Sequence, residues 1–215
     1  MKRIIIILIS LLAIFRINAL EKGNFGIRAT FDLSIPGNWN VNHENMDLFK
    51  PGAGFSIGGV YYRPLGKSFY LEPGISFFYN TYSFKDLSIT GADGTIKSED
   101  PSVRKSGIRI PVHFGYEFSL TDKWKLALYT GPEVNYVFSK TAHVKHRESL
   151  GEDFDPKTLG IDEHRNFDVA WKIGITVPFD YLWVGVDAAI GLTDLQPGKV
   201  SFRENRVSVT TTYYF

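Results

Sequence analysis

Apolar and polar residues alternate along most of this 215-residue chain, and this period of two constrains the fold more than any other feature. Alternation is typical of a β-strand, because successive side chains point to opposite faces of a sheet. The pattern predicts eight strands, over 24–34, 54–63, 69–80, 108–118, 124–138, 167–179, 182–193 and 206–215. No long window shows the i, i+3, i+4 spacing of an amphipathic helix, so we expect an all-β chain with a single mature domain.

The two faces of these strands differ in charge. One parity has 48 positions, of which only Arg63 is charged, and Arg63 lies at a strand end where a long side chain can reach lipid headgroups. The opposite parity carries eleven charged residues, namely Arg28, Asp32, Glu72, Arg109, Glu117, Lys125, Glu133, Asp168, Lys172, Asp187 and Arg206. Nine glycines share this charged face, namely Gly26, Gly54, Gly58, Gly74, Gly115, Gly131, Gly174, Gly185 and Gly191.

Alternation alone does not decide which face is inside, and a soluble ligand-carrying barrel would turn the apolar face inward. The apolar face holds too many aromatic side chains to fit inside an eight-stranded barrel, whereas glycines suit a narrow, crowded lumen. Aromatic residues also gather beside the shortest connections, as in the girdle at a membrane interface. These residues are Phe25, Tyr61, Phe69, Phe118, Trp124, Phe179, Tyr181 and Phe215.

The connections alternate in length. Tight turns are expected at 64–68, 119–123 and 179–181, and long polar loops at 35–53, 81–107, 139–166 and 194–205. Short periplasmic turns opposite long external loops are typical of outer-membrane barrels. We therefore predict an eight-stranded antiparallel up-and-down transmembrane β-barrel of the outer-membrane type, with both termini in the periplasm.

Three prolines lie inside the predicted strands, at Pro73, Pro111 and Pro132. Proline lacks the N–H that a ladder needs and often marks a bulge. A bulge at one of these prolines would reverse the facing of the residues beyond it, so the facing near them stays open at this point.

The first residues form a targeting segment. Lys2 and Arg3 precede an apolar run of signal-peptide length, which is too short to span a membrane as a helix. We expect a signal peptide over 1–19 and a barrel domain over 20–215; a buried core helix is the alternative. Removing 1–19 takes the 24 basic residues to 21 against 23 acidic ones, so the net charge changes from +1 to −2. No basic patch then suggests nucleic acid, and the lack of cysteine excludes disulfides and thiolate sites.

The chain ends with apolar or aromatic residues at alternate positions, including Val207, Val209, Tyr213 and the terminal Phe215. This ending resembles the C-terminal signal that the barrel assembly machinery of the outer membrane reads. The alternative is an edge strand that merely stops at Phe.

Several segments also resemble the PorT-like outer-membrane β-barrel domain family. They are 69–73 (FYLEP), 107–112 (GIRIPV), 129–133 (YTGPE), 168–174, 184–186 with 191–193, and 204–215. The chain departs from the family at Arg109, where an acidic or polar residue often precedes Ile-Pro. The resemblance implies an outer-membrane barrel; one family member takes part in protein secretion.

The inward charges have two interpretations. They could form an ion path, but their near balance favours paired ions that fill the interior, because an unpaired buried charge costs several kcal/mol. Glu72 and Glu133 could in principle act as acid and base, and His113 is expected to join the same network. No catalytic or cofactor site is expected.

One loop carries residue types that bind metal ions. The loop over 140–164 holds His143, His146, Asp162, Glu163 and His164, but it has no helical frame, so we favour a solvated loop over a metal centre. Trp39, Phe49 and Phe154 are loop aromatics that could anchor a protein or glycan, or could pack the loops on themselves.

The sequence thus predicts a small integral protein in the outer membrane of a Gram-negative bacterium. We expect a structural or adhesive role through external loops, with membrane lipids and the assembly machinery as partners. The alternatives are a lipid-modifying enzyme, a narrow channel and a component of a secretion apparatus.

Overall fold

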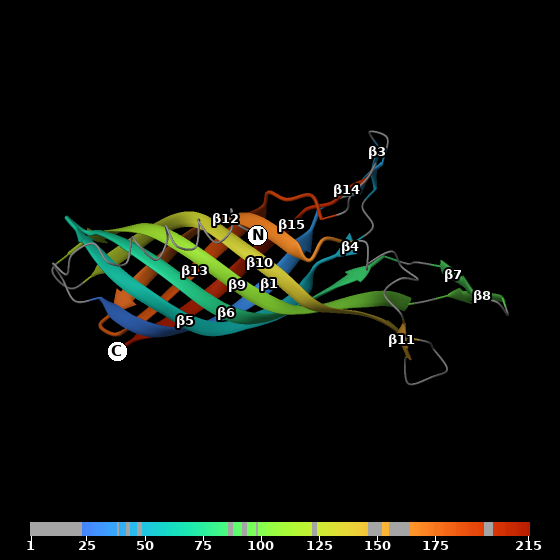
Figure 1. The fold of residues 1–215 in the computed structure, drawn as a ribbon, viewed down its shortest axis with the longest axis horizontal. Coiled ribbons are helices and arrows are strands. Elements are labelled where there is room, and N and C mark those ends of the chain that lie inside the picture. The colour runs from blue at the N-terminus through green and yellow to red at the C-terminus, as the bar shows by residue number, and fades with distance from the viewer. Residues whose placement is uncertain are drawn as a thin grey trace, which may run out of the picture.

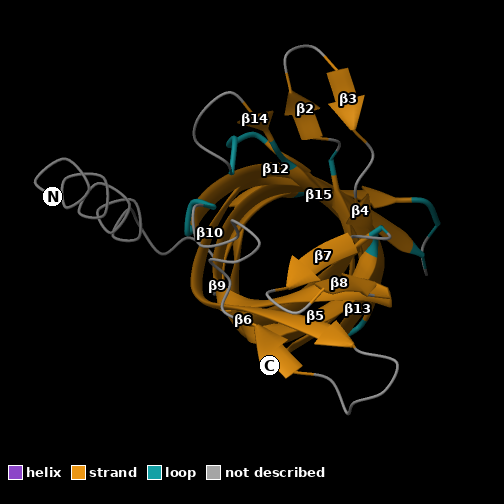
Figure 2. Ribbon diagram, turned by 90° about the vertical axis from the view of Figure 1, so that its right-hand side faces the viewer, coloured by secondary structure: helices purple, strands orange, loops and turns teal. Residues whose placement is uncertain are grey.

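The computed structural model describes residues 23–37, 39–41, 44–46, 49–85, 88–91, 94–97, 99–121, 124–145, 152–154, 164–195 and 200–215. Within these ranges, eight long antiparallel strands close into a barrel (Figures 1 and 2). They are β1 (Asn24–Pro36), β5 (Gly52–Gly66), β6 (Phe69–Phe84), β9 (Glu99–Ser119), β10 (Lys125–Lys145), β12 (Phe167–Phe179), β13 (Leu182–Gly191) and β15 (Glu204–Tyr214). Each strand pairs with the next, and β1 closes the ring by pairing with both β5 and β15. The predicted fold class is confirmed.

Short strands decorate one end of the barrel, opposite the tight turns (Figure 1). A small sheet contains β2 (Trp39–Val41), β3 (Glu44–Met46) and β14 (Val200–Ser201), and a hairpin contains β7 (Ser88–Gly91) and β8 (Gly94–Lys97). β4 (Phe49–Lys50) pairs with β6, and β11 (Glu152–Phe154) pairs with β10. No helix in the described part of the chain is long and apolar enough to cross a membrane.

Two of the tight turns have the positive φ angles that are typical of a two-residue hairpin. Lys67 and Ser68 both adopt positive φ, at 51° and 70°, as the two central residues of a type I′ turn do. Asp180 begins the β12–β13 turn with φ 50°. These turns therefore match the right-handed twist of the strands they join.

The predicted apolar face points outward. Phe25, Ile173 and Phe215 are 63%, 58% and 67% exposed, whereas Glu72 and Glu133 on the opposite parity are almost fully buried. Apolar side chains on the outside and charged side chains in the lumen are the arrangement of a membrane barrel.

The strands differ from the prediction in length, and no bulge lies at the three prolines. Segments expected as loops continue as strands, because β9 already begins at Glu99 and β10 ends only at Lys145. The prolines do not shift the register either: Pro73 pairs with Val112 and Ser76 with Arg109, so three steps along β6 match three along β9. A proline without an N–H interrupts the hydrogen bonds between two strands, but the register is kept because neither strand has an extra residue.

The register of β9 and β10 shifts elsewhere. Val137 pairs with Gly107 but Ser139 pairs with Ser106, so Phe138 is an extra residue in β10. Beyond this bulge the parity of β10 reverses. The predicted signal peptide, 1–19, lies outside the described residues.

Candidate functional site

Aromatic side chains fill the lumen near the tight turns. Tyr62, Tyr70, Trp183 and Tyr214 pack together, with ring centroids 5.0 Å apart for Tyr62–Tyr70 and 5.2 Å for Trp183–Tyr214. Tyr129 belongs to the same cluster. This aromatic layer was not predicted, because only the charged residues and the glycines distinguish the inward parity in the sequence.

Glycines make room for these rings. Tyr70 pairs directly with Gly115 across β6 and β9, and Tyr129 pairs with Gly174 across β10 and β12. A Cβ at Gly115 or Gly174 would lie 2.1 or 2.3 Å from the opposing ring. Some glycines on the charged face therefore leave space for a tyrosine ring on the neighbouring strand. This pairing can be predicted only once the register between the strands is known.

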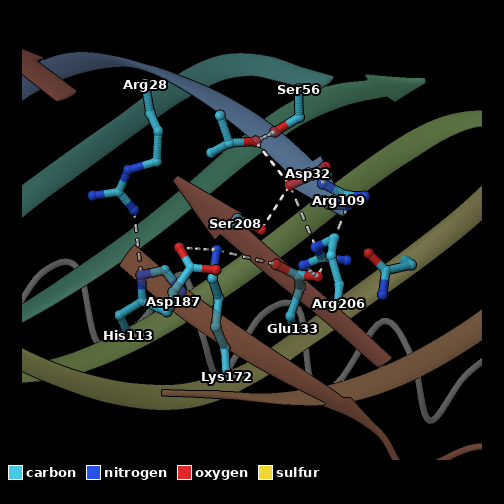
Figure 3. A network of polar contacts seen from close by, with 12 residues as sticks. Arg28, Asp32, Ser56, Arg109, His113, Glu133, Lys172, Asp187, Arg206 and Ser208 are labelled. Atoms are coloured by element: carbon cyan, nitrogen blue, oxygen red, sulfur yellow. Dashed lines mark hydrogen bonds and ion pairs between the residues drawn. The ribbon is translucent and has the colours of Figure 1, made fainter. Parts of the chain in front are cut away.

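A charged layer lies above the aromatic one. Arg28 binds Glu72 through two hydrogen bonds of 2.6 and 2.8 Å, and its Nε donates to Thr212 at 2.7 Å. His113 Nδ1 lies 3.0 Å from Glu72. It also lies 3.4 Å from the Arg28 guanidinium (Figure 3). The Tyr214 hydroxyl also donates to Glu72.

A second group of ions continues the layer. Arg109 donates to Asp32 at 2.5 Å, and Arg206 donates to Glu133 at the same distance (Figure 3). Ser208 on the last strand donates to Asp32 at 2.7 Å. The guanidinium of Arg109 also stacks over Phe78, 4.4 Å from its centroid.

Lys172 joins Asp187 to the second group. Its Nζ lies 3.1 Å from Asp187 and 3.8 Å from Glu133. Eight charged side chains of the layer, four of each sign, are at most 7% exposed: Arg28, Arg109, Lys172, Arg206, Asp32, Glu72, Glu133 and Asp187. The layer is therefore a balanced set of buried ion pairs.

The other three predicted lumen charges lie outside this layer. Glu117 accepts a hydrogen bond from Tyr62 and lies 3.9 Å from Lys125, whose side chain is 57% exposed. Asp168 accepts from Asn135 at 3.1 Å, nearer the long-loop end. Asp168 and Asn135 line a cavity of about 40 Å³ above the ions, which has room for water molecules only.

An apolar cluster closes the long-loop end of the lumen. It contains Phe49, Tyr82, Phe84, Val103, Ala142, Leu195 and Phe202. The Phe49 and Phe202 rings are 4.9 Å apart, and Lys105 pairs with Glu204 just beneath Tyr82. An exposed Phe49 is therefore the wrong alternative, because β4 pairs with β6 and brings that ring into the barrel mouth.

The three long strands that contribute to this cluster, β6, β9 and β10, have polar outer faces at this level. Their outward residues are Thr81, Ser83, Ser102, Arg104, Ser106, Ser139, Thr141 and His143. Below this level these strands have an apolar outer face and charged inward residues. Above it they have a polar outer face, and an apolar cluster lies inside. We name this upper part, residues 49, 80–84, 102–106, 139–143, 195 and 202, the collar.

The bulge at Phe138 permits this inversion on β10. Below it, Glu133, Asn135 and Val137 point inward; above it, Ala142 is fully buried while Thr141 is exposed. One extra residue moves the inward set from odd to even numbers.

The histidines of the suggested metal loop have different environments. His143 lies on the outward face of β10, whereas His164 is buried and its ring lies 5.3 Å from that of Phe202. His146, Asp162 and Glu163 lie outside the described residues, as do the side chains of Trp39 and Phe154. The described residues contain no group of three His, Asp or Glu side chains that could hold a metal ion.

The residues of the C-terminal pattern face outward on β15 and just after it. Val207, Val209, Tyr213 and Phe215 are each about half exposed or more. The Phe215 backbone N–H donates to the Phe25 carbonyl at 2.9 Å, which fixes the last residue against the first strand.

Comparisons with known proteins agree with this architecture. Residues 20–196 match the family model described as outer membrane protein beta-barrel domain. No curated protein matches the chain.

Several solved structures align along most of the chain. Ail of Yersinia pestis, solved with the heparin analogue sucrose octasulfate, is 11% identical with a TM-score of 0.41, and the alignment covers 91% of this chain and 100% of that one. Neisserial surface protein A is 13% identical with a TM-score of 0.42, and the alignment covers 91% of this chain and 100% of that one. OprG of Pseudomonas aeruginosa is 9% identical with a TM-score of 0.42, and the alignment covers 91% of this chain and 97% of that one.

Proposed function

The chain belongs to the outer membrane protein beta-barrel domain family, and on that premise we propose that it is a non-catalytic, non-conducting barrel whose collar binds a protein or glycan at the cell surface. It resides in the outer membrane of a Gram-negative bacterium. Within the family, we propose PorT-like membership on the segments 69–73, 107–112 and 129–133.

The inversion of polarity at the collar carries this proposal. β9 and β10 have 21 residues each, about twice the 9–11 that a tilted span requires. The upper part of these strands has its own apolar core and a polar outer face, as a water-soluble barrel does. A rigid surface held above the membrane is suited to binding, since little ordering is needed when a partner arrives.

The chemistry of the collar suits a polar ligand. Most of the side chains on its outer face are Ser or Thr and carry hydroxyl groups, and Arg104 adds a guanidinium. Hydroxyl groups can donate and accept hydrogen bonds, and Arg is a frequent anchor of binding energy at interfaces. A glycan or a polar protein surface offers matching groups.

The filled lumen supports the non-conducting part of the proposal. An aromatic layer, a balanced ionic layer and the collar core follow one another along the barrel axis. The ring in Figure 2 therefore encloses packed side chains rather than an open pore. An eight-stranded barrel is just wide enough to be filled in this way.

Site-specific photo-crosslinking on intact cells tests the proposal. A photoreactive residue at Thr141 in the collar should give a discrete adduct, and the same probe at Ile173 on the lipid-facing surface should not. Arg104→Glu should remove the adduct without changing the amount of barrel. Equal labelling at Thr141 and Ile173, or stepwise currents from the purified protein in planar bilayers, would overturn the proposal.

A lipid-modifying enzyme is a second candidate, favoured by one observation. The strand register places Ser102 opposite His143, and His143 opposite Asp153. A hydroxyl, an imidazole and a carboxylate are the residue types of a nucleophile, its base and an orienting acid. The Ser102 hydroxyl, however, donates to the His143 backbone carbonyl, at 3.4 Å.

Hydrolysis of a labelled phospholipid or of labelled lipid A by the purified barrel distinguishes the two candidates. Activity that disappears in both Ser102→Ala and His143→Ala would favour the enzyme. Activity at the level of a detergent blank is the result we expect.

A further inference from the structure

A groove interrupts the lipid-facing surface of β1, β5 and β6 near the tight-turn end. Its volume is about 810 Å³, and its walls include Phe25, Ile27, Tyr61, Pro73, Ile75 and Phe215. It is absent from the predicted functional sites, because apolar outward residues look alike in the sequence.

Gly59 forms the floor of the groove. It belongs to the outward parity of β5 and pairs with Ile27 on one side and Ile75 on the other. A Cβ at this position would meet nothing closer than the Gly26 carbonyl oxygen at 4.0 Å, so the space above Gly59 is open. A glycine between two isoleucines thus leaves a notch about one side chain deep.

The surroundings of the notch restrict what can fill it. The groove lies within the apolar band of a protein that resides in the outer membrane, on the side of the short turns. At that depth the available material is hydrocarbon. A flexible acyl chain can follow a narrow notch between side chains.

A cation lies at the headgroup end of the same strand. Arg63 is four residues beyond Gly59, which corresponds to about 13 Å of extended strand. It is the one charged residue among the 48 outward positions, and it follows Tyr61, which lines the groove. Guanidinium groups bind phosphate oxygens strongly, and long side chains at strand ends reach the headgroup level.

We propose that this groove binds one phospholipid of the periplasmic leaflet, with an acyl chain along Gly59 and the phosphate at Arg63. The aromatic rings of Phe25 and Tyr61, whose centroids are 4.9 Å apart, stand between the two positions and contact the glycerol region. This inference depends on the membrane location of the barrel and not on the proposed role of the collar.

Native mass spectrometry tests the proposal. The barrel is reconstituted in vesicles of phosphatidylethanolamine and phosphatidylglycerol, extracted in mild detergent and weighed with its retained lipids. The wild-type barrel should retain one phospholipid. Gly59→Leu should lower retention about tenfold, because filling the notch displaces two or so buried methylenes at about 0.8 kcal/mol each.

Arg63→Gln provides an independent variant that leaves the notch intact. It should lower retention about fivefold, since a basic residue near an anionic lipid surface contributes about 1 kcal/mol. Ala188→Leu on the outward face of β13 and Arg203→Gln, at an exposed arginine just before β15, are the matched controls, which should retain lipid like the wild type. Each variant is first shown to be folded by its faster migration on unheated SDS gels.

Three results would overturn the proposal. They are no retained phospholipid on the wild-type barrel, equal retention in all four variants, and a mass that shows a second copy of the barrel in place of the lipid.

Discussion

The carboxylate of Glu72 on β6 holds the guanidinium of Arg28 on β1 in a bidentate ion pair, although β5 lies between these strands. The same carboxylate contacts His113 on β9 and accepts from Tyr214 on β15. One side chain thus joins four strands, including the first and the last, across the inside of the barrel. The ionic layer is therefore part of what closes the ring.

Breaking this pair from one side should destabilise the barrel strongly. Glu72→Gln leaves Arg28 buried without its main counter-ion, and removal of one partner of a buried pair typically costs about 3–5 kcal/mol. The free energy of unfolding can be measured by urea titration in detergent micelles, followed by Trp fluorescence. Replacing both residues, as Arg28→Met with Glu72→Leu, should restore much of the loss.

The pair of Lys125 and Glu117 serves as the matched control. Its lysine is more than half exposed, so Lys125→Gln should change the free energy of unfolding by about 1 kcal/mol or less. If Glu72→Gln and Lys125→Gln had similar effects, the ionic layer would have no role in closing the barrel.

The glycines that leave space for tyrosine rings lead to a second prediction. Gly174→Ala puts a methyl group 2.3 Å from the Tyr129 ring, so the ring or the strand must move. Overpacking of this kind costs about 1–3 kcal/mol. Gly59→Ala adds the same methyl group into open space and should cost about 0.5 kcal/mol or less. Equal unfolding midpoints for the two variants would contradict the seating of Tyr129 on Gly174.

Much of the membrane-embedded barrel could be predicted from the sequence, because its alternation is regular and its two faces have opposite chemistry. The alternation on β12, from Phe167 to Phe179, fixes both the strand and its facing. The glycines could be assigned to the lumen for the same reason. Their pairing with Tyr70 and Tyr129 could not, since it depends on the register between strands.

The collar escaped prediction for a physical reason. A membrane-spanning strand is recognised by its apolar outer face, whereas around Val103 and Ala142 the apolar residues point inward and the outer face is polar. The bulge at Phe138 reverses the parity of β10, but neither it nor its two neighbours in the sequence is a proline or glycine that would have predicted it. The metal hypothesis rested on His143, His146 and His164 lying in one predicted loop, but the structure places His143 on the outward face of β10 and buries His164.

The C-terminal residue gives a third prediction. Phe215 is 67% exposed on the lipid side, so its ring adds little to the packed interior. Deleting it should lower the amount of folded barrel in the outer membrane several-fold, while refolding of the purified chain into detergent stays close to wild type. That combination would identify Phe215 as a recognition element for assembly.

Phe179→Ala is the control for this deletion, because Phe179 is another exposed aromatic near a tight turn. It should leave membrane levels unchanged. Equal losses for both changes would mean that girdle aromatics matter in general and that the C-terminal pattern has no special role.

The collar core gives the last prediction. Phe202 is almost fully buried and lies beside Phe49, Tyr82 and His164. Phe202→Ala removes this ring from the mouth of the barrel, and such substitutions in a core cost about 3–5 kcal/mol of local packing. Because the ionic layer lies below, the loss should loosen the collar and leave the membrane-embedded part folded.

Limited proteolysis of intact cells should then cut the variant faster at the long-loop end, while faster migration on unheated SDS gels persists. Phe138→Ala, which removes an outward ring at the bulge, should be cut at the wild-type rate. If Phe202→Ala no longer migrated faster on unheated SDS gels, the collar and the membrane-embedded barrel would unfold as one unit, and the prediction would be wrong.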